Sequence, residues 1–233
     1  MEKKASADQP WLRFYDEGVP ETIDYPEIRL DQLLADSATA YPLQRAIAFG
    51  GRVGSRILDA AISYQQLDDA VNRFAASLQQ MGVRQGDRVA IVMPNCPQFI
   101  IAFYGILRAG GIAVPCNFMY SPSELEHQLA DAGARVVVVL SPYYQKVHSI
   151  RTGASLRHVI VTNIKERFPS LLRFLFTLAK EKQGGHRVEL ASTGDFWFSS
   201  LLAGSSRTPG ETQVAPQDTA CLLYTGGTTG VPK

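Results

Sequence analysis

One segment has the periodic apolar pattern of a helix that lies on a protein core. Ser63 and Gln66 form an S-x-x-Q capping box, in which each side chain can bond the other residue's backbone N–H. Apolar residues then recur at spacings of four and three, which places them on one helical face: Leu67, Val71, Phe74, Leu78 and Met81. Gly82 follows as the expected C-terminal stop. The pattern predicts one amphipathic helix between Ser63 and Gly82.

After this helix, short apolar runs alternate with helical patterns. The apolar runs predict strands at 88–93, 112–116, 135–140 and 158–162. Helices are predicted from a cap at Asn95 to about Arg108, from the capping box of Ser121 and Glu124, and over 142–150. Short connections between alternating strands and helices are typical of βαβ units. The predicted fold class is therefore α/β, with a mostly parallel sheet flanked by helices.

Changes in pattern divide the chain into five predicted parts. These are an N-terminal arm (1–28), an α/β subdomain (29–164), a basic amphipathic insert (165–187), a linker-like stretch (188–218), and a strand with a glycine-rich loop (219–233). The arm contains prolines and no sustained period, and we expect it to lie along the surface. The subdomain should begin with a helix over 30–40 and strands at 46–49 and 56–62, joined by a glycine hairpin. The last strand is predicted at 220–224.

The insert 165–187 has a local charge of 6 − 2 = +4 from its Lys, Arg and Glu residues. Arg173, Thr177 and Lys180 form a narrow polar stripe on an otherwise apolar helix. One interpretation is a helix packed on the body with its charges in water. The other is a surface that contacts an anionic membrane.

Composition excludes several classes of protein. With 45% hydrophobic and 19% charged residues, the chain is typical of a globular protein. Its net charge of 23 − 22 = +1 gives no basic field, so no nucleic-acid partner is expected. The cysteines, Cys96, Cys116 and Cys221, lie far apart, which favours a reduced, cytoplasmic compartment over a disulfide framework. The histidines have no metal-ligand spacing. The apolar run 99–114 is too short to span a bilayer.

The candidate chemistry lies at 224–233, in the sequence Y-T-G-G-T-T-G-V-P-K. Its glycines allow backbone N–H groups to point toward an anion, and its threonines and Lys233 add further donors. Such a loop after a buried strand suits the binding of a polyphosphate. It is neither a Walker A loop nor a dinucleotide fingerprint, because Gly-Lys-Ser/Thr and G-x-G-x-x-G are both absent. The alternative is a flexible hairpin or tail.

The segment 224–233 resembles the phosphate loop of the adenylate-forming enzymes, the family of acyl-CoA synthetases, luciferases and peptide-synthetase adenylation domains. The form T-G-G-T-T-G, with Gly226 where serine is commonest, is similar to the long-chain fatty acid branch. Other segments also resemble the first subdomain of that family: 63–67, 82–90, 95–99, 110–117 and 124–135. The resemblance covers roughly residues 30–233.

The resemblance implies a fatty acid–CoA ligase with ATP and coenzyme A as substrates and Mg²⁺ as the counter-ion of ATP. By the same match, the residues that bind the ATP phosphates are Thr225, Gly226, Gly227, Thr228, Thr229, Gly230 and Lys233. No residue is expected to be catalytic or to hold a metal. Since the family's later motifs are not found, we expect an N-terminal fragment that is inactive alone. The alternatives are a ligase for an aryl, bile or medium-chain acid, and a non-catalytic docking module.

Overall fold

The protein is built on a five-stranded parallel sheet with the strand order β4-β3-β5-β6-β7. The computed structural model describes residues 9–225 apart from Gly54 and Ser192. The strands are β3 (Arg88–Val92), β4 (Ile112–Cys116), β5 (Val136–Leu140), β6 (His158–Thr162) and β7 (Asp195–Trp197), and each adjacent pair is parallel. This confirms the predicted α/β class.

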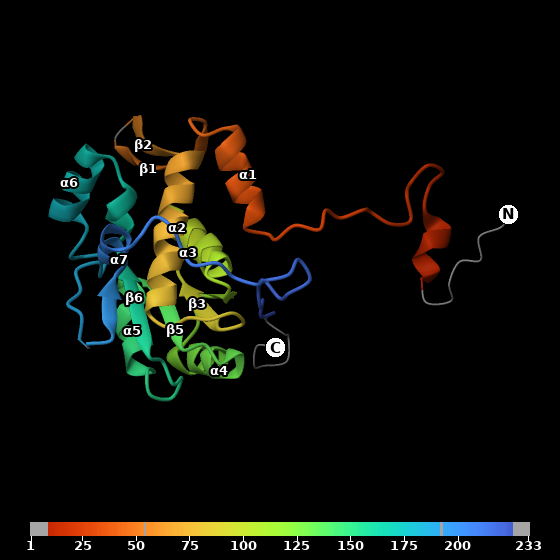
Figure 1. Ribbon diagram of the computed structural model, residues 1–233. Coiled ribbons are helices and arrows are strands. Elements are labelled where there is room, and N and C mark those ends of the chain that lie inside the picture. Colours follow the sequence, from red (N-terminus) through yellow and green to blue (C-terminus); the bar gives the residue numbers. More distant parts are fainter. Residues whose placement is uncertain (1–8, 54, 192, 226–233) are drawn as a thin grey trace.

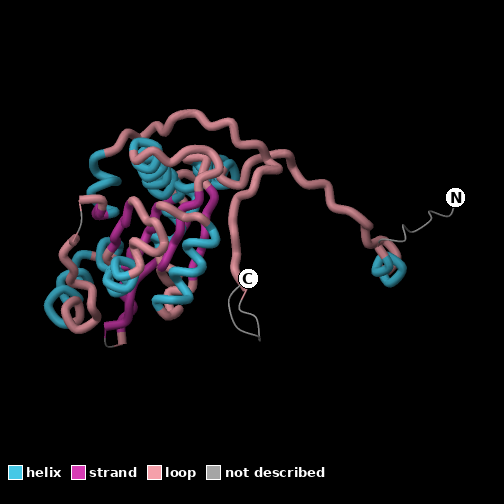
Figure 2. The backbone as a smooth tube through the Cα atoms, turned by 90° about the horizontal axis from the view of Figure 1, so that it is seen from below, coloured by secondary structure: helices cyan, strands magenta, loops and turns pink. Residues whose placement is uncertain are grey.

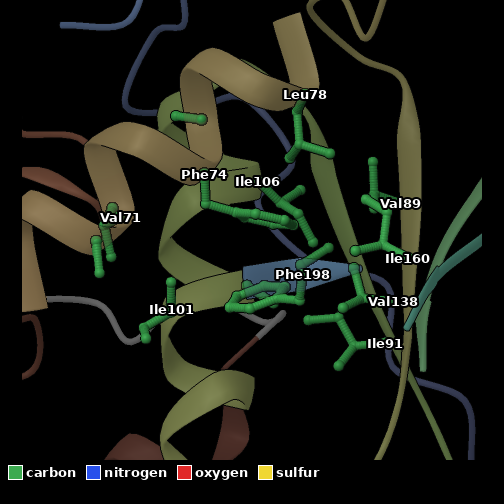
Figure 3. Close-up of a cluster of buried hydrophobic side chains, with 14 of the residues drawn as sticks. Val71, Phe74, Leu78, Val89, Ile91, Ile101, Ile106, Val138, Ile160 and Phe198 are labelled. Carbon is green, nitrogen blue, oxygen red and sulfur yellow. The ribbon is translucent and has the colours of Figure 1, made fainter. Parts of the chain in front are cut away.

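Helices cover both faces of the sheet, as Figure 1 shows. One face carries α2 (Tyr64–Gln80), α3 (Pro97–Arg108) and α7 (Phe198–Gly204), and the other carries α4 (Pro122–Ala132) and α5 (Tyr144–Ser149). Side chains alternate along each strand, so Val138 joins the first core while Val137 and Val139 join the second. Figure 3 shows the first core, where Phe74 and Phe198 meet between the helices and the sheet. Burial on both faces explains the valine run of β5.

The predicted helix caps are largely confirmed. Both sides of the capping box are formed at Ser63 and again at Ser121. Gly82 and Gly133 follow their helices with φ of 87° and 65°, which is the left-handed conformation that glycine adopts at little cost. The predicted cap of α3 at Asn95 is wrong. Cys96 occupies that position with extended backbone and no capping side chain, because Pro97 already supplies the first helical residue.

The N-terminal part of the subdomain differs in detail from the prediction. The strands β1 (Arg45–Val53) and β2 (Arg56–Ser63) are antiparallel, and β1 continues through Gly50 and Gly51, which we expected in the hairpin. A Cβ at Gly50 would lie 1.9 Å from the Leu58 carbonyl oxygen, so glycine permits the close approach of β2. The first α-helix, α1 (Gln32–Ala40), begins after Leu30 and not at it.

The arm does not lie along the surface as predicted. Residues 9–28, which include the 3-10 helix η1 (Pro10–Phe14), extend away from the body (Figures 1 and 2). The large apolar side chains of the arm are exposed, including Trp11, Phe14, Ile23 and Tyr25. The apolar side chains of the arm follow no helical or strand period, so they form no single face that could pack on the body.

The stretch 188–218 is more structured than a linker. It contains β7 at the edge of the sheet and then α7, whose Phe198 is fully buried. The Asp195 carboxylate accepts hydrogen bonds from Tyr144 at 2.5 Å and from Arg151, and these contacts hold β7 beside β6. The described remainder of the stretch, before and after these two elements, is irregular.

The predicted strand at 220–224 shortens to a single parallel bridge between Cys221 and Ala113 of β4. Ala113 donates to the Ala220 carbonyl at 3.0 Å and accepts from the Leu222 N–H at 2.9 Å. The next outward-facing residue of β4 is Pro115, which has no N–H to donate. Its carbonyl oxygen accepts instead from the side chain of Gln128 at 3.4 Å. The ladder therefore stops after one residue.

The insert 165–187 forms the helix α6 (Ser170–Ala179), preceded by the 3-10 helix η3 (Ile164–Arg167). A further 3-10 helix, η2 (Ser141–Tyr143), leads into α5. Among the described residues, no helix combines the length and the hydropathy needed to cross a bilayer.

Candidate phosphate-binding site

The carboxyl edge of the sheet is the candidate site because two neighbouring strands send their chains to opposite faces there. The chain after β3 enters α3 in the first core, and the chain after β4 enters α4 in the second core. Ligands of open parallel sheets bind where the connections diverge in this way, outside the carboxyl ends of the strands. The segment before the predicted phosphate loop runs parallel to β4, so the chain leads toward this edge.

Tyr224 is the first residue of the loop motif, and its side chain is held in place. Its hydroxyl donates a hydrogen bond to the Asp131 carboxylate in the last turn of α4. Burial and this carboxylate raise the pKa of Tyr224 to about 12, with a smaller effect from Cys116 at the end of β4. The phenol therefore stays protonated and able to donate at neutral pH.

Only the beginning of the predicted phosphate loop can be placed. Thr225 directly follows Tyr224 and is exposed. The other predicted phosphate-binding residues lie outside the described residues: Gly226, Gly227, Thr228, Thr229, Gly230 and Lys233.

A lysine that the sequence did not single out holds the loop between β4 and α4. The Nζ of Lys146 donates to the backbone carbonyl oxygens of Phe118 and Tyr120, both at 2.7 Å. The Asn117 side chain stabilises the same turn by accepting from the Met119 N–H at 3.0 Å. Because Lys146 lies on α5, the contact depends on tertiary packing and leaves no local signal.

The ends of β5 and β6 hold polar groups in structural contacts. The buried Ser141 hydroxyl lies 3.0 Å from Nδ1 of His186, and Asn163 donates to the His186 carbonyl at 3.0 Å. Burial lowers the pKa of His186 and so favours a neutral ring. Ser141 is only 1% exposed, so a substrate cannot reach its oxygen. This serine and histidine therefore fasten the end of the insert to the sheet.

The cysteines Cys96 and Cys116 are buried, as expected of core residues. Burial raises the pKa of both thiols, that of Cys116 to about 12. Neither thiol is therefore a nucleophile at neutral pH.

The best-formed cavity of the described residues does not lie at the carboxyl edge. A cavity of about 230 Å³ lies at the opposite edge, near Gly110 and the start of β4, and is also lined by Arg29, Gln85 and Asp218. In residues 9–225 without Gly54 and Ser192, no three His, Cys, Asp or Glu side chains gather as metal ligands would.

The five-stranded parallel sheet, with helices on both faces, is an open α/β fold, a class in which ligands bind outside the carboxyl ends of the strands. A family model for AMP-binding enzymes matches residues 34–233. The chain belongs to this family, as the motifs indicated.

Individual relatives agree with this assignment. The chain is 35% identical over 230 residues to a long-chain-fatty-acid–CoA ligase of Bacillus subtilis, with 97% of the chain and 39% of the relative covered. It is 33% identical over 171 residues to 4-coumarate–CoA ligase 3 of Oryza sativa, with 73% of the chain and 26% of that relative covered. A long-chain-fatty-acid–CoA ligase structure from Archaeoglobus fulgidus superposes with a TM-score of 0.70 at 24% identity, covering 94% of the chain and 38% of that protein. This last likeness shows the shared fold. The chain thus spans about 39% of the length of the B. subtilis ligase.

Proposed function

We propose that the whole protein is an ATP-dependent, AMP-forming long-chain fatty acid–CoA ligase. In the first step a fatty acid carboxylate attacks the α-phosphate of ATP, which gives an acyl-adenylate and releases diphosphate. In the second step the thiol of coenzyme A attacks the acyl carbon, which gives acyl-CoA and releases AMP. The family match and the sequence identity to bacterial long-chain ligases support this proposal.

The observation that carries the proposal is the path of the chain that leads into the loop motif. Residues 220–222 pair in parallel with β4 and Tyr224 is fixed to α4, beside the carboxyl edge from which α3 and α4 cover opposite faces of the sheet. In our proposal the threonine hydroxyls and backbone N–H groups of 225–230 donate to the β- and γ-phosphates. The ammonium of Lys233 offsets the charge that builds up on the leaving diphosphate.

Mg²⁺ would accompany ATP as its counter-ion and would supply further charge stabilisation. The described residues do not provide a metal-binding set, so we assign no magnesium ligand to this chain and derive no step through the ion.

We also propose that these 233 residues alone do not catalyse the formation of acyl-CoA, since they cover only 39% of the length of the B. subtilis ligase. The test is acyl-CoA formation by the isolated chain, and measurable turnover would refute this part.

A ligase for an aromatic acid is the second candidate. The 33% identity to 4-coumarate–CoA ligase 3 favours it over other acids.

Acid-dependent ATP–diphosphate exchange by the complete reading frame tests the function. We expect exchange with long-chain fatty acids, and a loss of at least about tenfold in Lys233→Met, because a charge-assisted contact to phosphate is removed. Lys180→Met is the matched control on an exposed lysine and should leave exchange unchanged. Exchange with aromatic acids alone would move the substrate to the second candidate. No exchange with any acid would refute ligase activity and favour a non-catalytic docking module.

A further inference from the structure

A second cavity lies at the amino edge of the sheet, where β3, β5 and β6 begin. It has a volume of about 300 Å³ and includes apolar side chains just after α2 and at the start of β5. Among the described residues that line it, the cations are Arg88, Arg135 and Arg157, and the one carboxylate is that of Asp87. The charge of these four side chains is 3 − 1 = +2, and the ring of His158 also lines the cavity. We call this feature the amino-edge cavity.

The register of the sheet brings the three arginines side by side. Val136 of β5 pairs with Val89 of β3 on one side and with His158 of β6 on the other. Each arginine immediately precedes one of these three residues, so the arginines occupy neighbouring strands about 4.8 Å apart. The backbone N–H of Arg157 donates to the Arg135 carbonyl oxygen at 2.7 Å, which extends the pairing to these two positions. The cluster therefore follows from the sheet itself.

Two of the three arginines have no partner in the described fold. The side chains of Arg135 and Arg157 are exposed, and their guanidinium groups form neither a hydrogen bond nor an ion pair with a described residue. The nearby carboxylate of Asp87 is directed at its own turn, since it accepts from the Arg84 N–H at 2.8 Å. A concave site lined by charge of one sign concentrates counter-ions more strongly than a flat surface does. The amino-edge cavity therefore favours an anion.

The helix ends at this edge do not occupy the two free cations. The end of α4 is closed by Arg88, whose Nε donates to the Ala132 carbonyl oxygen at 2.8 Å. The end of α2 is closed by its own backbone, because the Leu78 carbonyl oxygen accepts from the Val83 N–H at 3.0 Å. The N–H donors of Arg135 and Arg157 therefore remain available to a ligand from solution.

We propose that the amino-edge cavity binds a phosphate group carried by a small molecule in solution. The guanidinium groups of Arg135 and Arg157 donate to the phosphate oxygens, which suit their planar, forked N–H groups. A phosphate monoester carries a charge of about −1.5 to −2 at neutral pH, which matches the charge of +2 in the lining. A single carboxylate would balance only one of those two charges. A cavity of this volume holds a metabolite-sized ligand and not a folded domain.

Isothermal titration calorimetry on the chain tests the proposal, with inorganic phosphate and glycerol 3-phosphate as separate probes. We expect both probes to bind at low ionic strength, and added salt to weaken their binding. Tighter binding of glycerol 3-phosphate supports a phosphorylated metabolite as the natural ligand, and tighter binding of inorganic phosphate supports the free ion. Arg135→Gln/Arg157→Gln should weaken binding at least about tenfold, because two charge-assisted contacts are lost.

A matched control and a second measurement locate the bound anion. Arg173→Gln/Arg187→Gln removes the same charge from two exposed arginines outside the cavity, and it should bind both probes as the unaltered chain does. The backbone amide signals of Gly82 and Gly133, which line the cavity, should shift during titration in ¹⁵N NMR spectra of the unaltered chain. Circular dichroism should confirm that every variant is folded, and the NMR measurement decides if Arg135→Gln/Arg157→Gln does not fold.

Three results would overturn the proposal. The first is the absence of binding by either probe, and the second is unchanged binding in folded Arg135→Gln/Arg157→Gln. The third is binding that Lys233→Met removes while the amide signals of Gly82 and Gly133 stay in place, because the anion would then lie on the predicted phosphate loop. The cavity shares no residue with that loop, so the proposal does not depend on ligase activity.

Discussion

Replacing Phe198 by alanine should destabilise the protein more than any surface substitution. Its side chain is fully buried, and its ring centroid lies 4.7 Å from that of Phe74 in the core between α2, α7 and the sheet. The substitution therefore removes a large apolar group from a close-packed position between α2 and the sheet, where the surroundings can collapse only in part.

The magnitude follows from two contributions. Truncation of a buried phenylalanine to alanine costs about 3–5 kcal/mol, which includes the cavity that remains. The contact with the Phe74 ring contributes about 0.5–1.5 kcal/mol, and this contribution is already included in the cost of truncation. We expect a loss of about 4 kcal/mol in the free energy of unfolding. Phe198→Leu keeps most of the apolar volume and should lose only about 1.5 kcal/mol.

The assay is urea unfolding followed by circular dichroism, with the slope of the transition compared between variants. Phe174→Ala is the matched control, because Phe174 is 61% exposed and its truncation should change stability by less than about 0.5 kcal/mol. If Phe198→Ala does not fold, Phe198→Leu can still be compared with Phe174→Ala, and it should lose more stability than that surface variant. A loss below about 1.5 kcal/mol for Phe198→Ala at an unchanged slope would refute the packing argument.

Three further predictions concern hydrogen bonds and one titrating group. Ser121→Ala removes the side chain that caps α4 and should cost about 1 kcal/mol in urea unfolding, whereas Ser200→Ala, at an exposed serine, should cost almost nothing. Tyr144→Phe removes the hydrogen bond to the buried Asp195 and should lower the free energy of unfolding by about 1–3 kcal/mol in the same urea experiment. An unchanged free energy of unfolding would contradict a stabilising role for this bond. Burial lowers the pKa of His186 below its ordinary value of 6.5, so the folded state binds this proton less readily than the unfolded state does. The stability that the neutral ring contributes is present above pH 6.5 and is lost as the pH falls below it. Between pH 7 and about pH 5.5, the free energy of urea unfolding should therefore fall less in His186→Gln than in the unaltered chain. An equal fall in both would contradict this prediction.

The helix caps and the central strands could be predicted because their signals are local. The side chains of Ser63 and Ser121 bond backbone groups three residues ahead, so a window of four residues contains the whole interaction. The valine run of β5 likewise carries its own evidence of burial. The resemblance at 224–233 also depended on one short segment of sequence.

The elements that were missed depend on contacts between distant residues. Strand β7 is only three residues long, and its Asp195 is held by Tyr144, which lies 51 residues earlier. The bridge at Cys221 is limited by Pro115 and Gln128, on segments far upstream. At the candidate site, the contacts of Lys146 with the turn after β4 and of Tyr224 with Asp131 are likewise tertiary. No pattern within a single element carries this information.

Pro115 has a further consequence for how copies of the chain meet one another. The outer edge of β4 is a place where a strand from another molecule could add to the sheet and begin aggregation. The outward N–H of Ala113 is already bonded to Ala220, and Pro115 offers no donor at the next outward position. The Pro115 carbonyl oxygen is occupied by Gln128. A neighbouring chain therefore finds no run of free donors and acceptors along β4, and this edge is protected against strand addition while the molecule remains folded.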